Sequence, residues 1–245
     1  MGMKSITWEI RPQTQPTSST CSPTALSILL AHYGDAIEPL DIEAMVPQSV
    51  NVKGEKLGTI NQQLATWCLS KGYKVTMYSF DCQIIDQSWS KLDQDEILER
   101  LKLRSEGWVV PAMGADWTKE YAQSYAEFII AGGKLEITNA VTTDLLHKLL
   151  EKGPFLPCVS YSTMYGAART RIVDDYESPD DDINGRALNH SIVVYVIDGS
   201  GNFKIADPSV SKNPGLQTIA PEVMLAAIST AQIECDNLLF QLEKS

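Results

Sequence analysis

Long hydrophobic runs are missing from this sequence of 245 residues. No stretch of about 18 apolar residues occurs, and a membrane-spanning helix needs at least that many. The opening residues, MGMKSITWEI, lack the apolar segment of a secretory signal peptide. They also lack the Ser or Thr at the sixth position that an N-myristoylation motif requires. We therefore expect a cytoplasmic protein that does not insert into a membrane.

Paired cysteines and positive charge are also scarce. The number of cysteines is odd, and they show neither CxxC nor metal-ligand spacing: Cys21, Cys68, Cys82, Cys158 and Cys235. This pattern argues against a disulfide framework and a structural zinc site.

The 20 Lys and Arg residues are outnumbered by 31 Asp and Glu, which gives a formal net charge of −11. Such an acidic surface repels phosphate groups, so we expect neither nucleic acid nor a membrane surface as a partner.

The remaining composition is typical of a globular domain, with 44% apolar and 21% charged residues. Helical spacing of apolar residues recurs over residues 21–34, 59–70, 95–103, 117–130 and 143–151. Two strand-like segments lie in this first part of the chain, at residues 5–10 and 73–80. Strands dominate the second part, over residues 155–161, 190–198, 202–207 and 237–242, with a helix at 221–229.

This order of elements predicts an α+β fold in a single domain over residues 1–245. In it, a helical half over about residues 11–152 packs on an antiparallel sheet over about residues 153–245. The first helix is the best delimited element. Because Pro23 is tolerated only in a first turn, this helix must begin within a residue or two of Cys21. Gly34 stands where a left-handed C-terminal cap belongs.

Cys21 is a candidate nucleophile because of its place at a helix start. The unpaired N–H groups and the dipole of a helix N-terminus stabilise an anion, which lowers the pKa of a thiol there. A cysteine that opens a core helix is, however, often a small buried apolar residue. The position alone therefore leaves both interpretations open.

His190 and Asp207 are the candidate partners of that thiol. Of the two other histidines, His32 lies in the last turn of the first helix and His147 on a helix surface, where we expect structural roles. The turn residues 198–202 predict a hairpin between the flanking strands. If Asp198 faces Phe203, Asp207 projects on the same side as His190, whereas a slip of one residue would separate them. Alternatively, Asp207 is only a turn residue before Pro208.

Two stretches carry a family resemblance: QPTSSTCSPTALSILLAHYG at residues 15–34 and NHSIVVYVIDGSGNFKIADPS at residues 189–209. Their order of Gln, Cys, His and Asp resembles the papain-like cysteine peptidases. More specifically, the spacing of Gln15 six residues before Cys21, the pair Tyr33-Gly34 and the pair Asp207-Pro208 resemble the bacteriocin-processing peptidases that act on double-glycine leaders. The two stretches cover about 40 of the 245 residues.

The resemblance implies a papain-like fold and a thiol hydrolase, most simply a peptidase that forms a covalent thioester with a peptide or protein substrate. It assigns Cys21 as nucleophile, His190 as base and Asp207 as the residue that orients the imidazole. Gln15, with Gln13 as the fallback, would stabilise the oxyanion together with the N–H of Cys21. This chemistry needs no cofactor and no metal.

Two departures from the family leave other functions open. Ser22 and Pro23 follow the cysteine where the family has Gly, and extra residues lie between Phe80 and Thr143. The same triad could serve an acyltransferase, a peptide ligase or a glutamine deamidase. A non-catalytic domain that binds leader peptides is a further alternative, although such a domain has no need of all three triad residues.

Two segments near His190 could contact a substrate. Within the acidic segment 174–185, the residues from Asp180 to Gly185 resemble the opening of a calcium-binding loop. Ser191, however, stands at the twelfth position counted from Asp180, where such a loop has Glu. The acidic segment is either a solvated loop or a lid that selects basic or amine-bearing substrates. The segment YSTMYG, residues 161–166, contains Tyr161 and Tyr165, which either line a substrate cleft or cover the sheet.

Overall fold

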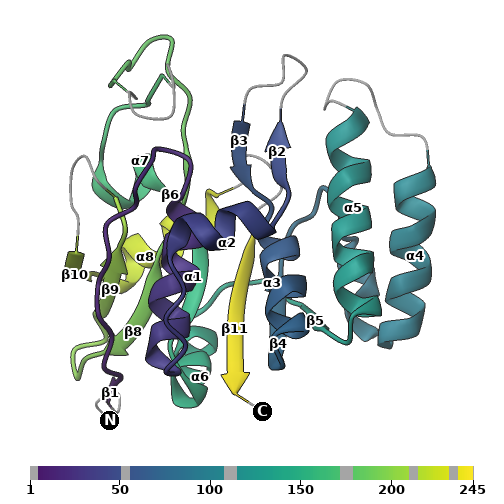
Figure 1. Ribbon diagram of the computed structural model, residues 1–245, viewed down its shortest axis with the longest axis horizontal. Helices are drawn as coiled ribbons and strands as arrows, with labels where there is room; N and C mark the ends of the chain where they lie inside the picture. The colour runs from purple at the N-terminus through teal and green to yellow at the C-terminus, as the bar shows by residue number, and fades with distance from the viewer. Residues whose placement is uncertain are drawn as a thin grey trace.

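The computed structural model describes residues 5–50, 56–107, 115–171, 179–209, 215–231 and 237–244. These residues form a 3-10 helix, η1 (Gln87–Lys91), and eight α-helices: α1 (Cys21–His32), α2 (Pro39–Met45), α3 (Asn61–Ser70), α4 (Gln94–Glu106), α5 (Ala115–Ile130), α6 (Thr143–Lys152), α7 (Tyr161–Tyr165) and α8 (Pro221–Ser229). They also form eleven strands: β1 (Ile6–Thr7), β2 (Gln48–Val50), β3 (Lys56–Thr59), β4 (Tyr73–Ser79), β5 (Lys134–Ile137), β6 (Phe155–Ser160), β7 (Asn189–Ser191), β8 (Val193–Ile197), β9 (Phe203–Asp207), β10 (Gly215–Ile219) and β11 (Leu238–Lys244). The α+β class is confirmed (Figure 1).

One large sheet organises the molecule. Its strand order is β10-β9-β8-β6-β11-β4-β5, with β1 paired to β8 and β7 paired to β6, while β2 and β3 form a separate hairpin. The strands after residue 153 pair antiparallel to one another, as predicted. The expectation of a purely antiparallel sheet is corrected at one edge, since β5 runs parallel to β4. A parallel pair needs a long crossover connection, which here contains α4 and α5.

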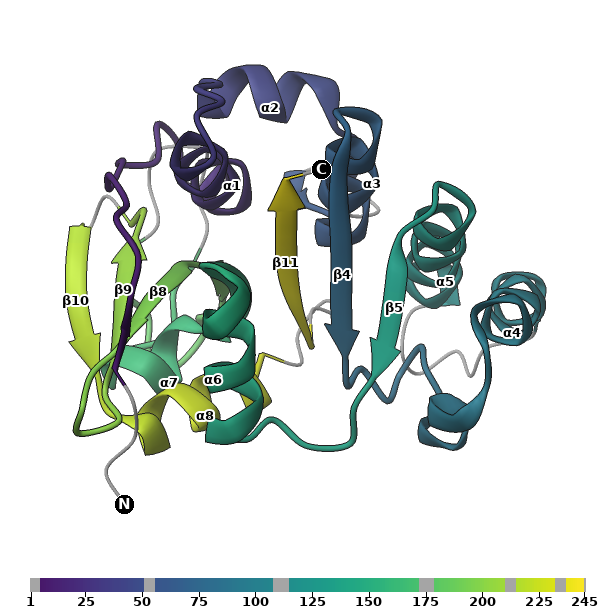
Figure 2. The ribbon, with the colours of Figure 1, turned by 90° about the horizontal axis from the view of Figure 1, so that it is seen from below.

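Helices cover both faces of this sheet (Figure 2). In Figure 2, α1 and α3 lie on one side of the sheet, and α6, α7 and α8 lie on the other. The side chains of β4 divide accordingly: Val75 and Met77 belong to the core under α1 and α3, and Tyr78 packs against the core on the opposite face. This alternation follows from the two-residue repeat of a strand.

Helix α1 is held on the sheet along its length. It contacts β6, β7 and β8, and every residue from Ser22 to Leu30 is buried. The helix begins at Cys21, as Pro23 in the first turn predicts, and Gly34 follows it in the left-handed region with φ of +90°. Burial fixes the axis of α1 against the sheet, so Cys21 at its first position has a defined place beside β7.

Other predicted elements are found close to their expected bounds, including α8 and β9. The segment expected as one strand over 190–198 is divided at Ile192 into β7, which pairs with β6, and β8, which pairs with β1, β6 and β9. Within the described ranges, no helix is long and apolar enough to cross a membrane. The single-domain assignment remains a prediction.

Candidate active site

The N-terminus of α1 is left open at Cys21. Thr20 occupies the capping position but turns its hydroxyl back onto the carbonyl of Thr17, at 3.0 Å. Pro23 has no N–H to be capped. The N–H groups of Cys21 and Ser22 therefore have no acceptor in the described part of the chain, and they can stabilise an anion.

His190 and Asp207 come together through an irregular register. Ile197, and not Asp198, pairs with Phe203, so the pairing expected from the sequence is off by one residue at the turn. A bulge between Val194 and Val196 adds a second residue to the shift. Side chains alternate between the two faces of a strand, so a total shift of two residues leaves Asp207 on the same face as His190.

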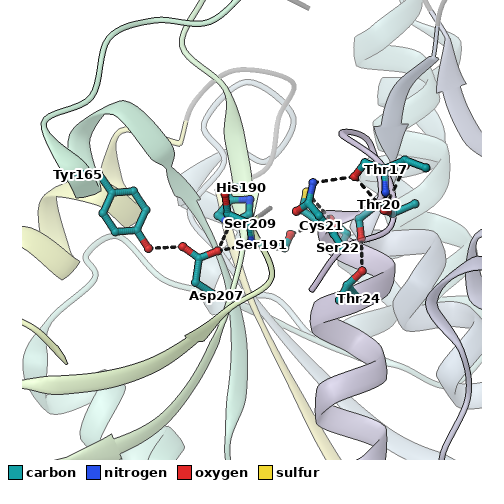
Figure 3. Close-up of polar contacts among 11 residues, drawn as sticks. Thr17, Thr20, Cys21, Ser22, Thr24, Tyr165, His190, Ser191, Asp207 and Ser209 are labelled. Atoms are coloured by element: carbon teal, nitrogen blue, oxygen red, sulfur yellow. Dashed lines mark hydrogen bonds and ion pairs between the residues drawn. The ribbon is translucent and has the colours of Figure 1, made fainter. Parts of the chain in front are cut away.

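The two side chains are in direct contact (Figure 3). The Nε2 of His190 lies 2.6 Å from Oδ1 of Asp207, and the N–H of Ser209 donates to the same oxygen at 2.7 Å. Asp207 is fully buried, and His190 is only 6% exposed. Because Nε2 is occupied by the carboxylate, Nδ1 is the ring nitrogen that remains for a thiol.

Cys21 and His190 polarise each other. Burial alone would raise the pKa of the Cys21 thiol, but a hydrogen bond to His190, its positive charge and a backbone hydrogen bond from Ser191 together lower it. Burial would lower the pKa of His190, but Asp207 and Cys21 raise it well above the ordinary value. The pKa of Asp207 is lowered by His190 despite burial, which raises it. These shifts favour a thiolate beside an imidazolium.

Two hydrogen bonds fix Gln15 between the segment after Asp207 and the turn before Cys21. Its backbone N–H donates to the carbonyl of Pro208 at 2.8 Å, next to Asp207. Its side-chain Nε2 donates to the carbonyl of Thr17 at 2.8 Å, in the turn that leads into Cys21. A carbonyl can only accept, so this bond identifies the nitrogen of the amide. The second N–H of Nε2 has no acceptor among the described residues. Gln13, the fallback, instead accepts a hydrogen bond from Ser27 at 2.9 Å.

Ser22 links the two halves of the site. Its hydroxyl lies 2.7 Å from the hydroxyl of Ser191 and 4.0 Å from the sulfur of Cys21. Ser22 directly follows Cys21, and Ser191 directly follows His190. This buried contact therefore ties the start of α1 to β7.

Tyr161 contacts His190, and Tyr165 contacts Asp207. The hydroxyl of Tyr165 donates to Oδ2 of Asp207. The rings of Tyr161 and His190 pack edge-to-face, with their centroids 5.5 Å apart. The two tyrosine rings also pack against each other, at 4.8 Å. Their predicted role in substrate binding remains a prediction. Their contact with His190 and Asp207 was missed because it depends on α7, a one-turn helix without an apolar repeat.

The other candidate residues lie elsewhere. The imidazole of His32 contacts the carbonyl of Glu9 at 2.9 Å, and His147 lies 3.6 Å from Glu151 on α6. Cys68 and Cys158 are buried and Cys82 is exposed, whereas Cys235 lies outside the described residues.

The acidic segment 174–185 is described from residue 179 onward only. There Asp181 accepts the backbone N–H groups of Ile183 and Asn184 at 3.2 and 2.7 Å, as in a polar turn. In the described ranges, no group of three or more His, Cys, Asp or Glu side chains is arranged to hold a metal. A lid role for this segment stays a prediction.

Comparison with known proteins assigns the chain to no family. No family model matches the sequence, and no curated protein matches it. Among solved structures, the chain is similar to the crystal structure of a candidate C39-like peptidase from Bacillus anthracis. The two chains are 9% identical, the match covers 99% of each, and the TM-score is 0.47. The function is therefore inferred from the chemistry of the site.

Proposed function

We propose that the protein is a papain-like thiol hydrolase that cleaves an amide bond of a peptide or protein substrate. One observation carries the proposal: Cys21 stands at an open helix N-terminus that the Ser22–Ser191 contact ties to the strand of His190, and Nε2 of His190 is held by the buried carboxylate of Asp207. A nucleophile, a base and an orienting carboxylate in this order are the parts that covalent acyl transfer requires.

In the proposed reaction, the Cys21 thiolate attacks the carbonyl carbon of the substrate and a C–S bond forms. The developing oxyanion accepts hydrogen bonds from the backbone N–H of Cys21 and from Nε2 of Gln15. The His190 imidazolium protonates the leaving amine as the C–N bond breaks, which leaves a thioester on Cys21. His190 then takes a proton from water, the hydroxide attacks the thioester, and the carboxylic acid and the thiolate are released.

The local contacts favour catalysis over simple peptide binding. Thr20 and Pro23 leave the helix N-terminus uncapped, although a capping side chain typically contributes about 1 kcal/mol of stability. Three groups bind the Asp207 carboxylate and so hold it in one orientation: the ring of His190, the hydroxyl of Tyr165 and the N–H of Ser209. A peptide-binding surface has no need for an ion pair held in this way.

The test is to trap the acyl-enzyme. The two sequence stretches resemble the bacteriocin-processing peptidases, so precursor peptides with double-glycine leaders are the first substrates to try. A peptide library follows. We expect cleavage products and a transient mass increase on the tryptic peptide that contains Cys21. Cys21→Ala should lose both signals, while the control Cys82→Ala, at an exposed cysteine, should keep them.

Two outcomes would point to the alternatives. Products that carry an added amine in place of water would favour an acyltransferase or ligase, and release of ammonia from glutamine would favour a deamidase. If the parent protein and Cys21→Ala bind the same peptides equally and neither turns them over, the protein is a non-catalytic binding domain.

A further inference from the structure

We propose that Tyr165 is a positioning residue of this site: its hydroxyl holds the carboxylate of Asp207 in the orientation that supports the imidazolium of His190. The effect on the ion pair follows from the geometry alone. Its consequence for turnover rests on the proposed function.

The two oxygens of the Asp207 carboxylate accept hydrogen bonds from different partners. Oδ1 accepts from Nε2 of His190 at 2.6 Å and from the N–H of Ser209 at 2.7 Å. Oδ2 accepts from the hydroxyl of Tyr165. Asp207 is fully buried, so water cannot replace a lost partner without rearrangement. The tyrosine therefore sets the rotation of the carboxylate about its Cβ–Cγ bond, and with it the direction of Oδ1.

Tyr165 remains a donor throughout the working pH range. Burial and the charge of Asp207 raise the pKa of its hydroxyl above the ordinary value, so the proton stays on the phenol. The groups that face the carboxylate are the ring of His190, this hydroxyl and the N–H of Ser209. The ring of Tyr161 packs against the ring of Tyr165, and Tyr161 also contributes to the raised pKa of the Tyr165 hydroxyl.

Helix α7 places this hydroxyl independently of β9, which carries Asp207. The hydroxyl of Ser160 accepts the N–H of Thr163 at 3.3 Å and caps the helix. Gly166 ends it in the left-handed region, with φ of +58°. The hydroxyl of Thr230, directly after α8, donates to the hydroxyl of Thr163 at 2.9 Å. Because these anchors do not involve the phenol, Tyr165→Phe removes one oxygen and leaves the ring in place.

The experiment follows the rate of Cys21 alkylation by iodoacetamide as a function of pH. A hydrogen bond to a charged group is worth about a 10- to 100-fold change in an equilibrium, or about one to two pKa units. We expect Tyr165→Phe to move the acid limb of the profile to higher pH by about this amount. The downfield proton resonance of His190 Nε2–H should also shift. The control Tyr78→Phe, at a half-buried tyrosine of β4, should leave both unchanged.

A double-mutant cycle tests the route of the effect. In the Asp207→Asn background there is no carboxylate to hold, so Tyr165→Phe should add little. An unmoved profile for Tyr165→Phe, or effects that simply add in the double variant, would overturn the proposal. Should Tyr165→Phe fold poorly, site-specific 3-fluorotyrosine at position 165 strengthens the donor, and a shift to lower pH is then expected. None of these readouts requires turnover, so absence of hydrolysis would refute the proposed function without deciding the role of Tyr165.

Discussion

Replacing Asp207 with Asn should uncouple His190 from Cys21 while preserving the shape of the site. The side chain is fully buried, and Asn has nearly the same volume, so we expect the fold to persist. The charge of the carboxylate, 2.6 Å from Nε2, disappears. An opposite charge at this range shifts a pKa by about 1 to 3 units, so the pKa of His190 should fall by that amount.

The effect should reach the thiol because the two groups share one proton. Asp207 raises the pKa of His190, and the imidazolium in turn lowers the pKa of Cys21. With a weaker imidazolium, the ratio of the thiolate–imidazolium pair to the neutral thiol–imidazole pair should fall by about 10- to 1,000-fold. The apparent pKa of Cys21 should therefore rise toward its ordinary value.

The assay is quenched alkylation with iodoacetamide between pH 4 and 9, read by mass spectrometry on the peptide that contains Cys21. The exposed Cys82 serves as an internal reference within the same chain. Superimposable pH profiles for the parent and Asp207→Asn would refute the reasoning, since the carboxylate would then have no electrostatic influence on the thiol.

Two further predictions concern the oxyanion site and stability. Gln15→Ala should lower kcat by about 10²- to 10³-fold with little change in KM, as loss of one oxyanion donor does, whereas Gln13→Ala should leave kcat nearly unchanged; equal losses in steady-state assays would contradict this assignment. Asp81→Asn should stabilise the protein at pH 8, because burial raises the pKa of Asp81 to about 6 despite opposing hydrogen bonds from Gln83 and Ile84. A raised carboxyl pKa costs stability above about pH 6 and nothing below about pH 4, so denaturant unfolding should show a gain of about 3 kcal/mol at pH 8 that vanishes at pH 4. A gain of equal size at both pH values would show that charge burial is not its cause.

The sequence was most informative where one residue leaves little choice. Pro23 restricts the start of α1, and the start places Cys21 at the helix N-terminus. Gly34 likewise marks the end of that helix. Such positions depend on local sterics, which act within one or two turns and can be read without knowledge of the rest of the fold.

The pairing of His190 with Asp207 was predicted for a partly incorrect reason. The expected register assumed an uninterrupted hairpin, but β8 pairs one residue earlier at the turn and carries a bulge at Tyr195. Nothing in the local composition marks the bulge, because it depends on how β8 meets its neighbouring strands. The outcome agreed because the two shifts together preserve the face of the strand.

Contacts made by short or irregular elements could not be predicted. Strand β5 has four residues, and its partner β4 lies more than 50 positions earlier in the chain. The bond from Tyr165 to Asp207 spans 42 positions and depends on the place of α7 beside β9. Long-range packing of this kind has no periodic signature in the sequence.

The central claim is that Cys21 is an activated thiolate at neutral and mildly acidic pH, and limited alkylation at pH 5 tests it most directly. With substoichiometric iodoacetamide and mass mapping of all five cysteines, Cys21 should be modified first. It should react before the exposed Cys82 and well before the buried Cys68 and Cys158. In His190→Ala, Cys21 should no longer be alkylated faster than the other cysteines. If another cysteine reacts first in the parent protein, or if Cys21 keeps its lead without His190, the thiolate–imidazolium account is wrong.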